Sequence, residues 1–208
     1  MEEKYMHVDK VILRAVLSTV IAMLVLLAFL VLTLSFVFPS AWMKITYDLG
    51  MDGVSIRNAK RAYHYSGEVS YIAYATEVAI GADNDERVAE CGEMFLDDET
   101  FDAYCQERNA SLPENADGLY EQYVYGQVSV AKYRLGDKDG AVTLAFDGVE
   151  NCFPKNNAVV ALLLTALKAN DSDTVETIKR KMNEMASSVG SDTEKTYLEE
   201  MRSLAENG

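Results

Sequence analysis

The feature that most constrains this chain is a run of 24 residues, from Ala15 to Phe38, that contains no charged side chain. At 1.5 Å per residue, a helix of this length exceeds the ~30 Å hydrocarbon core of a bilayer. Only serine and threonine interrupt the run, so it lacks the polar stripe of a helix that packs inside a soluble protein. We therefore predict a transmembrane helix over residues 15–38.

A cleavable secretory signal peptide is the main alternative to a retained anchor. Its apolar core usually spans ~7–15 residues and ends at small residues. Here the run is much longer, and its exit reads Phe38, Pro39, Ser40, Ala41 and Trp42. This exit favours an anchor that stays in the mature protein.

Basic residues near the ends of the run predict its orientation. Lys4, Lys10 and Arg14 precede it, whereas only Lys44 and Arg57 lie within about twenty residues after it. The bias predicts a cytoplasmic N-terminus (1–14), a single membrane span, and a C-terminal part outside the cytoplasm. A eukaryotic anchor whose domain faces the cytosol remains the alternative.

The part of the chain after the run is strongly acidic. The formal net charge of the chain is −14. Residues 1–38 contain three acids and three bases, so the whole excess belongs to residues 39–208. Such a charge repels phosphate backbones and anionic lipids, which argues against nucleic-acid binding and against a second, peripheral membrane contact.

Residues 39–208 have the apolar spacing of helices. No stretch alternates apolar and polar residues between turn signals, and stripes such as the one from Val159 to Leu167 recur at helical spacing. Gly67 and Gly136 follow apolar runs as C-terminal caps would, while Asp83 and Asp173 are expected N-terminal caps. After a linker or short helix at 39–54, we predict an all-α domain over 55–208, with a candidate seam at 110–117 and helices near 55–66, 69–82, 84–96, 98–109, 117–135, 138–152, 156–169, 172–188 and 191–206.

These helices are expected to pair as antiparallel hairpins. The expected turns centre on Gly67, Asp98, Gly136 and Asn170, with spacings of 31, 38 and 34 residues. The repeat length resembles that of tetratricopeptide repeats, which contain about 34 residues and two helices each. An irregular all-α domain without true repeats is the alternative.

The segment 133–156 carries the resemblance. It has an aromatic residue (Tyr133), a Gly-Asp turn at Gly136, a small residue at Ala141, and Pro154 before the next helix. This order is similar to the second half of a tetratricopeptide unit, and it implies a helical stack that binds peptides in its concave face. An anchor followed by such repeats also resembles, in architecture, accessory subunits of the bacterial secretion machinery.

Small residues in the same segment have a packing role whatever its ancestry. Ala141, Ala145 and Gly148 would let two helices approach closely where they cross.

The sequence lacks the motifs of common catalytic sites. It has two histidines, His7 and His64, and neither a phosphate-binding nor a dinucleotide-binding glycine motif. The acidic clusters at 83–86 and 97–99 lack the glycine and the glutamate of a calcium-binding loop and are better explained as helix caps. We therefore expect a protein that is not an enzyme and that needs no cofactor or metal.

Two functions fit this pattern. One is a membrane-anchored interaction or scaffold module that binds a peptide segment or another subunit of a cell-envelope complex. Among its twelve tyrosines, Tyr65 and Tyr125 lie off the apolar stripes and are the expected exposed, partner-binding residues. The other is a structural subunit that acts through its span, in which Ser18 and Ala22 pack against a second transmembrane helix.

Cys91 and Cys105 are a candidate disulfide. Each lies seven residues from Asp98, so a hairpin of helices 84–96 and 98–109 would place them at one height. The alternative for Cys91 is a buried hydrophobic role on the stripe of Val88 and Phe95. Cys152 is expected to be a buried thiol.

Overall fold

The computed structural model describes residues 2–111, 119–152 and 158–188 together with Glu199 and Ser203. The described residues form these helices: α1 (Glu2–Val37), α2 (Pro39–Asp48), α3 (Asp52–Ser66), α4 (Val69–Gly81), α5 (Asp85–Leu96), α6 (Phe101–Ala110), α7 (Tyr120–Arg134), α8 (Lys138–Cys152), α9 (Ala158–Lys168) and α10 (Ser172–Ser188).

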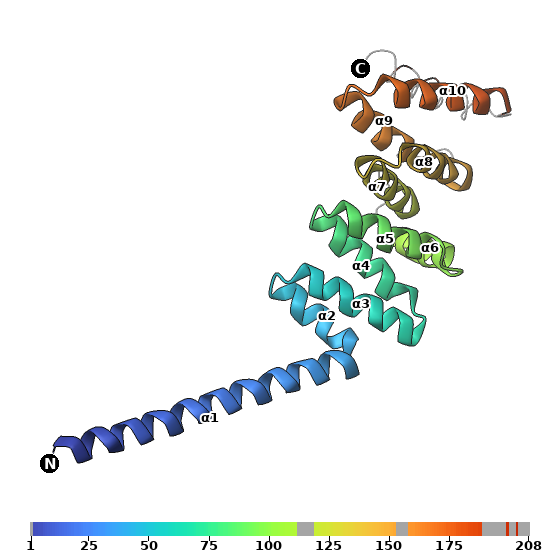
Figure 1. The fold of residues 1–208 in the computed structure, drawn as a ribbon. Helices are drawn as coiled ribbons and strands as arrows, with labels where there is room; N and C mark the ends of the chain where they lie inside the picture. The colour runs from blue at the N-terminus through green and yellow to red at the C-terminus, as the bar shows by residue number, and fades with distance from the viewer. Residues whose placement is uncertain (1, 112–118, 153–157, 189–198, 200–202, 204–208) are drawn as a thin grey trace.

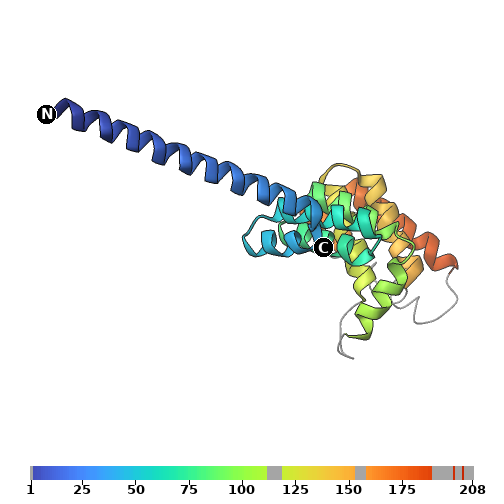
Figure 2. The same cartoon turned by 90° about the horizontal axis from the view of Figure 1, so that it is seen from below.

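The predicted all-α architecture is confirmed. In the part of the chain that the structure describes there is no strand, and one long apolar helix precedes a helical stack. Figure 1 shows α1 projecting from one end of the stack, and Figure 2 shows the same projection from below. Apart from Glu199 and Ser203, the helix predicted at 191–206 lies outside the described residues, as does most of the seam predicted at 110–117.

A sharp corner joins α1 to α2. Phe38 separates the two helices and has a φ of −130°, and Pro39 occupies the first turn of α2. Proline suits this position because its missing N–H would have no helical partner there. The buried Ser55 hydroxyl donates to the backbone oxygen of Met43 at 2.6 Å, which fastens α2 to α3. The segment expected as a linker or short helix is therefore a packed helix.

Glycine caps end α3 and α7 as the sequence predicts. Gly67 has a φ of +70° and Gly136 a φ of +95°, a left-handed conformation that glycine adopts without strain. The Gly67 amide donates to the Tyr63 carbonyl at 2.8 Å.

The predicted N-terminal caps are wrong by one or two residues. Asn84, not Asp83, caps α5 by accepting from the Arg87 amide at 3.1 Å. Asp171, not Asp173, caps α10 by accepting from the Thr174 amide. In each turn the residue directly before the cap, Asp83 or Asn170, has a left-handed φ.

The helix pairing agrees with the predicted hairpins in three places and differs in one. α3 packs along α4, α7 packs along α8, and α9 contacts α10. The predicted pairing of α5 with α6 is wrong, because α5 packs along α4 and α7, whereas α6 contacts α7 and α4. The short helix α6 therefore lies to one side of the main succession of helices (Figure 1).

Two groups of buried apolar side chains fill the stack. The first runs from Met43 in α2 to Ala131 in α7, and the second from Tyr133 in α7 to Met182 in α10. Helix α7 contributes to both groups, so it connects the two halves of the stack.

Small residues mark the places where α7 meets its neighbours. A Cβ atom on Gly92 would lie 2.2 Å from Val128, one on Gly126 would lie 3.2 Å from the Cα atom of Ala158, and one on Gly148 would lie 2.9 Å from Tyr125. These glycines let α5, α9 and α8 approach α7. The predicted small residues Ala141, Ala145 and Gly148 are all buried.

Candidate interaction surfaces

Helix α1 has a long exposed segment that is mostly apolar. From Ile12 to Thr33 every side chain is exposed, and the segment Ile12–Val37 is long and apolar enough to cross a membrane. The hydroxyl groups of Thr19 and Thr33 donate to backbone oxygens one turn earlier, at 2.9 and 2.8 Å. This bonding leaves no unpaired hydroxyl donor on either threonine, as a lipid environment requires.

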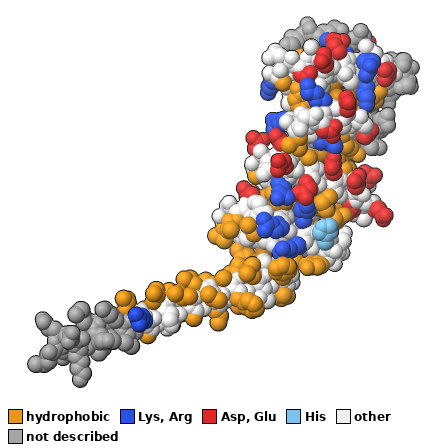
Figure 3. All heavy atoms as spheres, in the orientation of Figure 1, with side chains coloured by type: hydrophobic (Ala, Val, Ile, Leu, Met, Phe, Trp, Pro, Cys, Tyr) orange, Lys and Arg blue, Asp and Glu red, His pale blue; other side chains and the backbone are white. Residues whose placement is uncertain are grey.

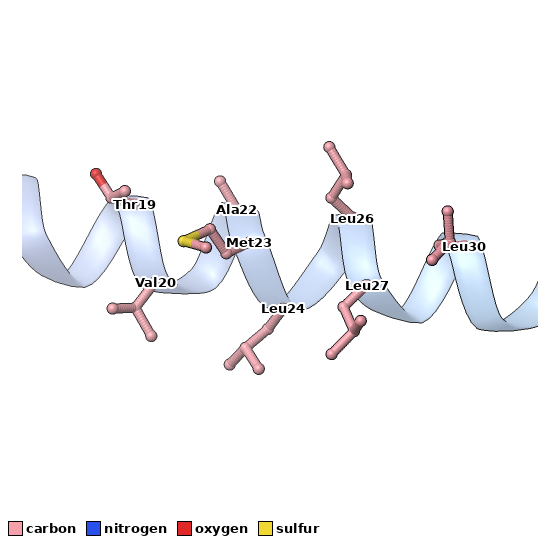
Figure 4. Close-up of a pocket in the computed structure, with 8 residues that line it drawn as sticks. All are labelled: Thr19, Val20, Ala22, Met23, Leu24, Leu26, Leu27 and Leu30. Carbon is pink, nitrogen blue, oxygen red and sulfur yellow. The ribbon is translucent and has the colours of Figure 1, made fainter.

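Ser18 and Ala22 lie one turn apart on α1, and both are exposed. A shallow hollow on this helix is lined by Thr19, Val20, Ala22, Met23, Leu24, Leu26, Leu27 and Leu30. In Figure 4 Ala22, Thr19 and Leu26 lie along one edge of the helix, and Leu24 and Val20 along the opposite edge. Of the two residues predicted to pack against a second helix, only Ala22 lines this hollow.

Tyr65 lies in the last turn of α3 with 70% of its surface exposed, which confirms the predicted exposure. Its neighbour His64 is exposed as well. Tyr63, by contrast, is half-buried and donates its hydroxyl to Asp98. Tyr65 is therefore the tyrosine of α3 whose ring is exposed.

The predicted exposure of Tyr125 is wrong. Its ring is half-buried and meets the ring of Phe101 edge-on, with 6.0 Å between centroids. Gly148 of α8 lies directly against it. Because α7 has neighbours on several sides, a residue off one apolar stripe still faces another helix. The exposed tyrosine of α7 is Tyr123.

Five aromatic residues join α5, α6 and α7, and we name them the aromatic joint: Phe95, Phe101, Tyr104, Tyr120 and Tyr125. Phe95 lies 4.8 Å from Phe101 and 5.6 Å from Tyr104, both edge-on. Such pairs stabilise packing by about 0.5–1.5 kcal/mol beyond burial alone. The sequence shows the tyrosine enrichment but not this cluster, because its members meet only after α6 folds against α7.

Glu77 of α4 fastens this joint to the stack. Its carboxylate accepts from the Arg108 guanidinium and from the Tyr120 hydroxyl, each at 2.7 Å. Burial, together with the bond to Glu77, raises the pKa of Tyr120 well above its usual value. The phenol therefore stays protonated as a donor, and the arrangement is a structural link between α4, α6 and α7.

Two similar hydrogen bonds between a tyrosine and an aspartate occur in different parts of the stack. Tyr63 donates to Asp98 at 2.7 Å, and Tyr133 donates to Asp171 at 3.0 Å. Each aspartate lies in a turn and also accepts from a threonine hydroxyl shortly after it, Thr100 or Thr174. The sequence pattern does not reveal these pairs, although their separations of 35 and 38 residues lie close to the repeat length.

Lys138 and Thr174 stabilise the charged form of Asp171. Its carboxylate pairs with the Lys138 ammonium at 2.6 Å. This bond, followed by those from Thr174 and Tyr133, holds the pKa of Asp171 far below its usual value.

Cys91 and Cys105 are both buried, and no disulfide joins them. Burial raises the pKa of the Cys91 thiol to about 11, so it is protonated at neutral pH. The geometry behind the predicted bond is absent because α5 does not pair along its length with α6. Cys152 lies outside the residues whose side chains are described.

Among the residues that the structure describes, no group of three or more histidine, cysteine, aspartate or glutamate side chains could hold a metal ion.

Comparisons with protein-family models, with curated proteins and with solved structures found no match to this chain.

Proposed function

We propose that this chain is a membrane-anchored, non-catalytic interaction or scaffold module. Helix α1 holds it in the membrane with the N-terminus in the cytoplasm, and the helical stack outside binds a peptide segment or another subunit of a cell-envelope complex. The observation that carries the proposal is the fully exposed apolar length of α1, which continues through one residue into a packed helical domain.

The corner between α1 and α2 supports a retained anchor over a cleaved signal peptide. Pro39 is buried, and the Arg61 guanidinium of α3 lies 4.2 Å from the ring centre of Phe36 in α1. The end of the apolar run is thus part of the packing of the domain. Removal of the apolar run would take Phe36 out of this packing.

The pairing of the later helices supports a tetratricopeptide-like stack. Helix α7 packs against α8 in its own hairpin and against α9 of the next hairpin. Stacked hairpins of this kind form extended surfaces that bind peptides. On this proposal Tyr65 is a partner-contacting residue, since its ring is exposed and its area can be buried at low entropic cost.

A structural subunit that works through α1 is the second candidate. The hollow beside Ala22 favours it, because a small residue on an exposed helix lets another transmembrane helix approach. In that case the stack only covers the assembly and Tyr65 has no partner.

Exchange of α1 separates the two candidates. In one variant of the full chain, residues 15–38 are replaced by an unrelated leucine-rich span, which keeps the domain at the membrane. Partners captured by cross-linking are then compared with those of the unchanged chain. If the chain is an interaction module, the exchanged variant should capture the same partners. Tyr65→Ala should then lose these partners, whereas the matched control Tyr123→Ala should keep them. Loss of all partners on exchange of the span would instead establish the structural role.

A further inference from the structure

The helices next to α1 carry a charge opposite to that of the rest of the domain. Residues 39–66 contain four bases and two acids, a net charge of +2, which leaves −16 on residues 67–208. Figure 3 shows lysine and arginine side chains gathered where α1 meets the stack, with acidic side chains spread over the helices beyond. The overall acidity of the domain therefore conceals a local basic region.

Three of these bases are placed for contact with a charged surface. Lys44 of α2 and Arg57 of α3 are exposed, and neither takes part in an ion pair within the described residues. Arg61 lies over the Phe36 ring at the end of the apolar segment. The fourth base, Lys60, is neutralised by Glu90 of α5.

Exposed apolar side chains accompany these bases. Ile45, Tyr47 and Leu49 in and after α2 are exposed, Leu49 to 67%, and Met51 follows in the turn to α3. They continue the exposed apolar surface of α1 beyond the corner at Pro39. Apolar side chains next to lysine and arginine are typical of helices that lie in the interfacial region of a bilayer.

We propose that α2 and α3 form a basic collar that binds the surface of the bilayer into which α1 inserts. Lys44, Arg57 and Arg61 contact the phosphate groups of anionic phospholipids, and Ile45 and Leu49 enter the boundary between headgroups and acyl chains. The same lipids repel the acidic helices beyond the collar, which fixes the orientation of the stack. This inference rests on the proposed anchoring by α1.

The single tryptophan of the chain gives a direct test. Trp42 lies in α2, within the collar, so its fluorescence reports the contact of this helix with lipid. The full chain is reconstituted in vesicles of phosphatidylcholine and in vesicles with equal parts of phosphatidylcholine and phosphatidylglycerol. Each contains a fraction of lipid brominated near the headgroup. We expect stronger quenching of Trp42 when phosphatidylglycerol is present, and loss of the difference in high salt.

Charge reversal assigns the effect to the collar. Lys44→Glu with Arg57→Glu should abolish the extra quenching by phosphatidylglycerol. The matched control, Lys168→Glu with Arg180→Glu, makes the same change of charge on exposed side chains of α9 and α10 and should retain it.

Two results would overturn the inference. The first is Trp42 quenching in the unchanged chain that does not depend on phosphatidylglycerol. The second is extra quenching by phosphatidylglycerol that persists when Lys44 and Arg57 are both replaced by glutamate. Extraction by alkaline carbonate tests the anchor separately. A chain released by carbonate refutes the anchoring and the collar together, whereas a chain that resists extraction but lacks the lipid effect refutes the collar alone.

Discussion

At the scale of single residues, the tyrosine–aspartate bonds explain how turns are fixed between distant helices. Tyr133 of α7 and Asp171 before α10 are both largely buried, and a charged acceptor makes the bond stronger than one between neutral groups. The bond joins a helix end to a cap, so one hydroxyl supports both α7 and α10.

Removal of one hydroxyl should measure this contribution. We expect Tyr133→Phe to lower the free energy of unfolding by about 1–2 kcal/mol, because Asp171 loses a donor but keeps Lys138 and Thr174. Urea denaturation of the detergent-solubilised chain, followed by circular dichroism, measures the loss. Tyr65→Phe is the control, since Tyr65 is exposed, and should change stability by less than about 0.5 kcal/mol. Equal effects of the two substitutions would contradict the assigned role.

The low pKa of Asp171 predicts a dependence of stability on pH. A carboxyl group whose pKa is lower in the folded chain than its unfolded value of about 3.9 stabilises the fold above that value. The contribution is lost as the pH falls toward the folded pKa. Between about pH 5 and pH 3 the unchanged chain should therefore lose more stability than Asp171→Asn, measured by denaturation at each pH. If the unchanged chain and Asp171→Asn lost equal stability over this pH range, the ion pair between Asp171 and Lys138 would not form.

At the scale of helices, α5 is held from both sides. Glu90 pairs with Lys60 of α3, and Glu93 pairs with Lys132 of α7. These ion pairs are partly exposed, and pairs of this kind contribute at most about 1 kcal/mol each. The close approach of α5 to α7 at Gly92 contributes more to stability than these ion pairs, because it buries the Val128 side chain.

A methyl group at this crossing should separate α5 from α7. We expect Gly92→Ala to destabilise the fold by about 1–3 kcal/mol, because its Cβ would lie 2.2 Å from the buried Val128 side chain. Gly53→Ala in α3 is the matched control, since nothing lies within 4 Å of its Cβ position, and should be neutral or stabilising by up to about 1 kcal/mol. Adding Val128→Ala to Gly92→Ala should cost less than the sum of the single changes, and strict additivity would refute the contact.

The bounds of the helices could be predicted from the sequence better than which helices pack together. The predicted ranges 69–82, 138–152 and 172–188 match α4, α8 and α10 to within one residue, because periodicity and caps are local properties of the chain. The pairing of α5 and the burial of Tyr125 depend on which helices meet in three dimensions. The apolar stripe of one helix does not show how many other helices pack against it, and several helices pack against α7.

At the scale of the whole molecule, the distribution of charge matters more than its total. The net charge of −14 argues against a second membrane contact, whereas Lys44 and Arg57, in the two helices that follow α1, are exposed and take part in no ion pair among the described residues. The basic collar that we propose depends on the corner at Pro39, where the chain turns from α1 into α2. Composition averages over a length of chain, but a membrane contacts a local surface.

The orientation of the molecule is the remaining prediction at this scale. Lys4, Lys10 and Arg14 lie in α1 before its apolar run, and such basic residues are retained in the cytoplasm during insertion. We therefore expect Tyr65→Cys, at an exposed position of the stack, to react with a membrane-impermeant maleimide in intact cells or spheroplasts. Met6→Cys, before the span, should react only after the membrane is permeabilised.

The native cysteines make this experiment practicable. Cys91 and Cys105 are buried, and the raised pKa of Cys91 keeps its thiol protonated at the pH of labelling. The unchanged chain, treated in parallel, gives the background from all three native thiols. Labelling of Met6→Cys in intact cells, with Tyr65→Cys protected until lysis, would reverse the assigned topology. The stack would then face the cytosol, and its partners would have to be sought there.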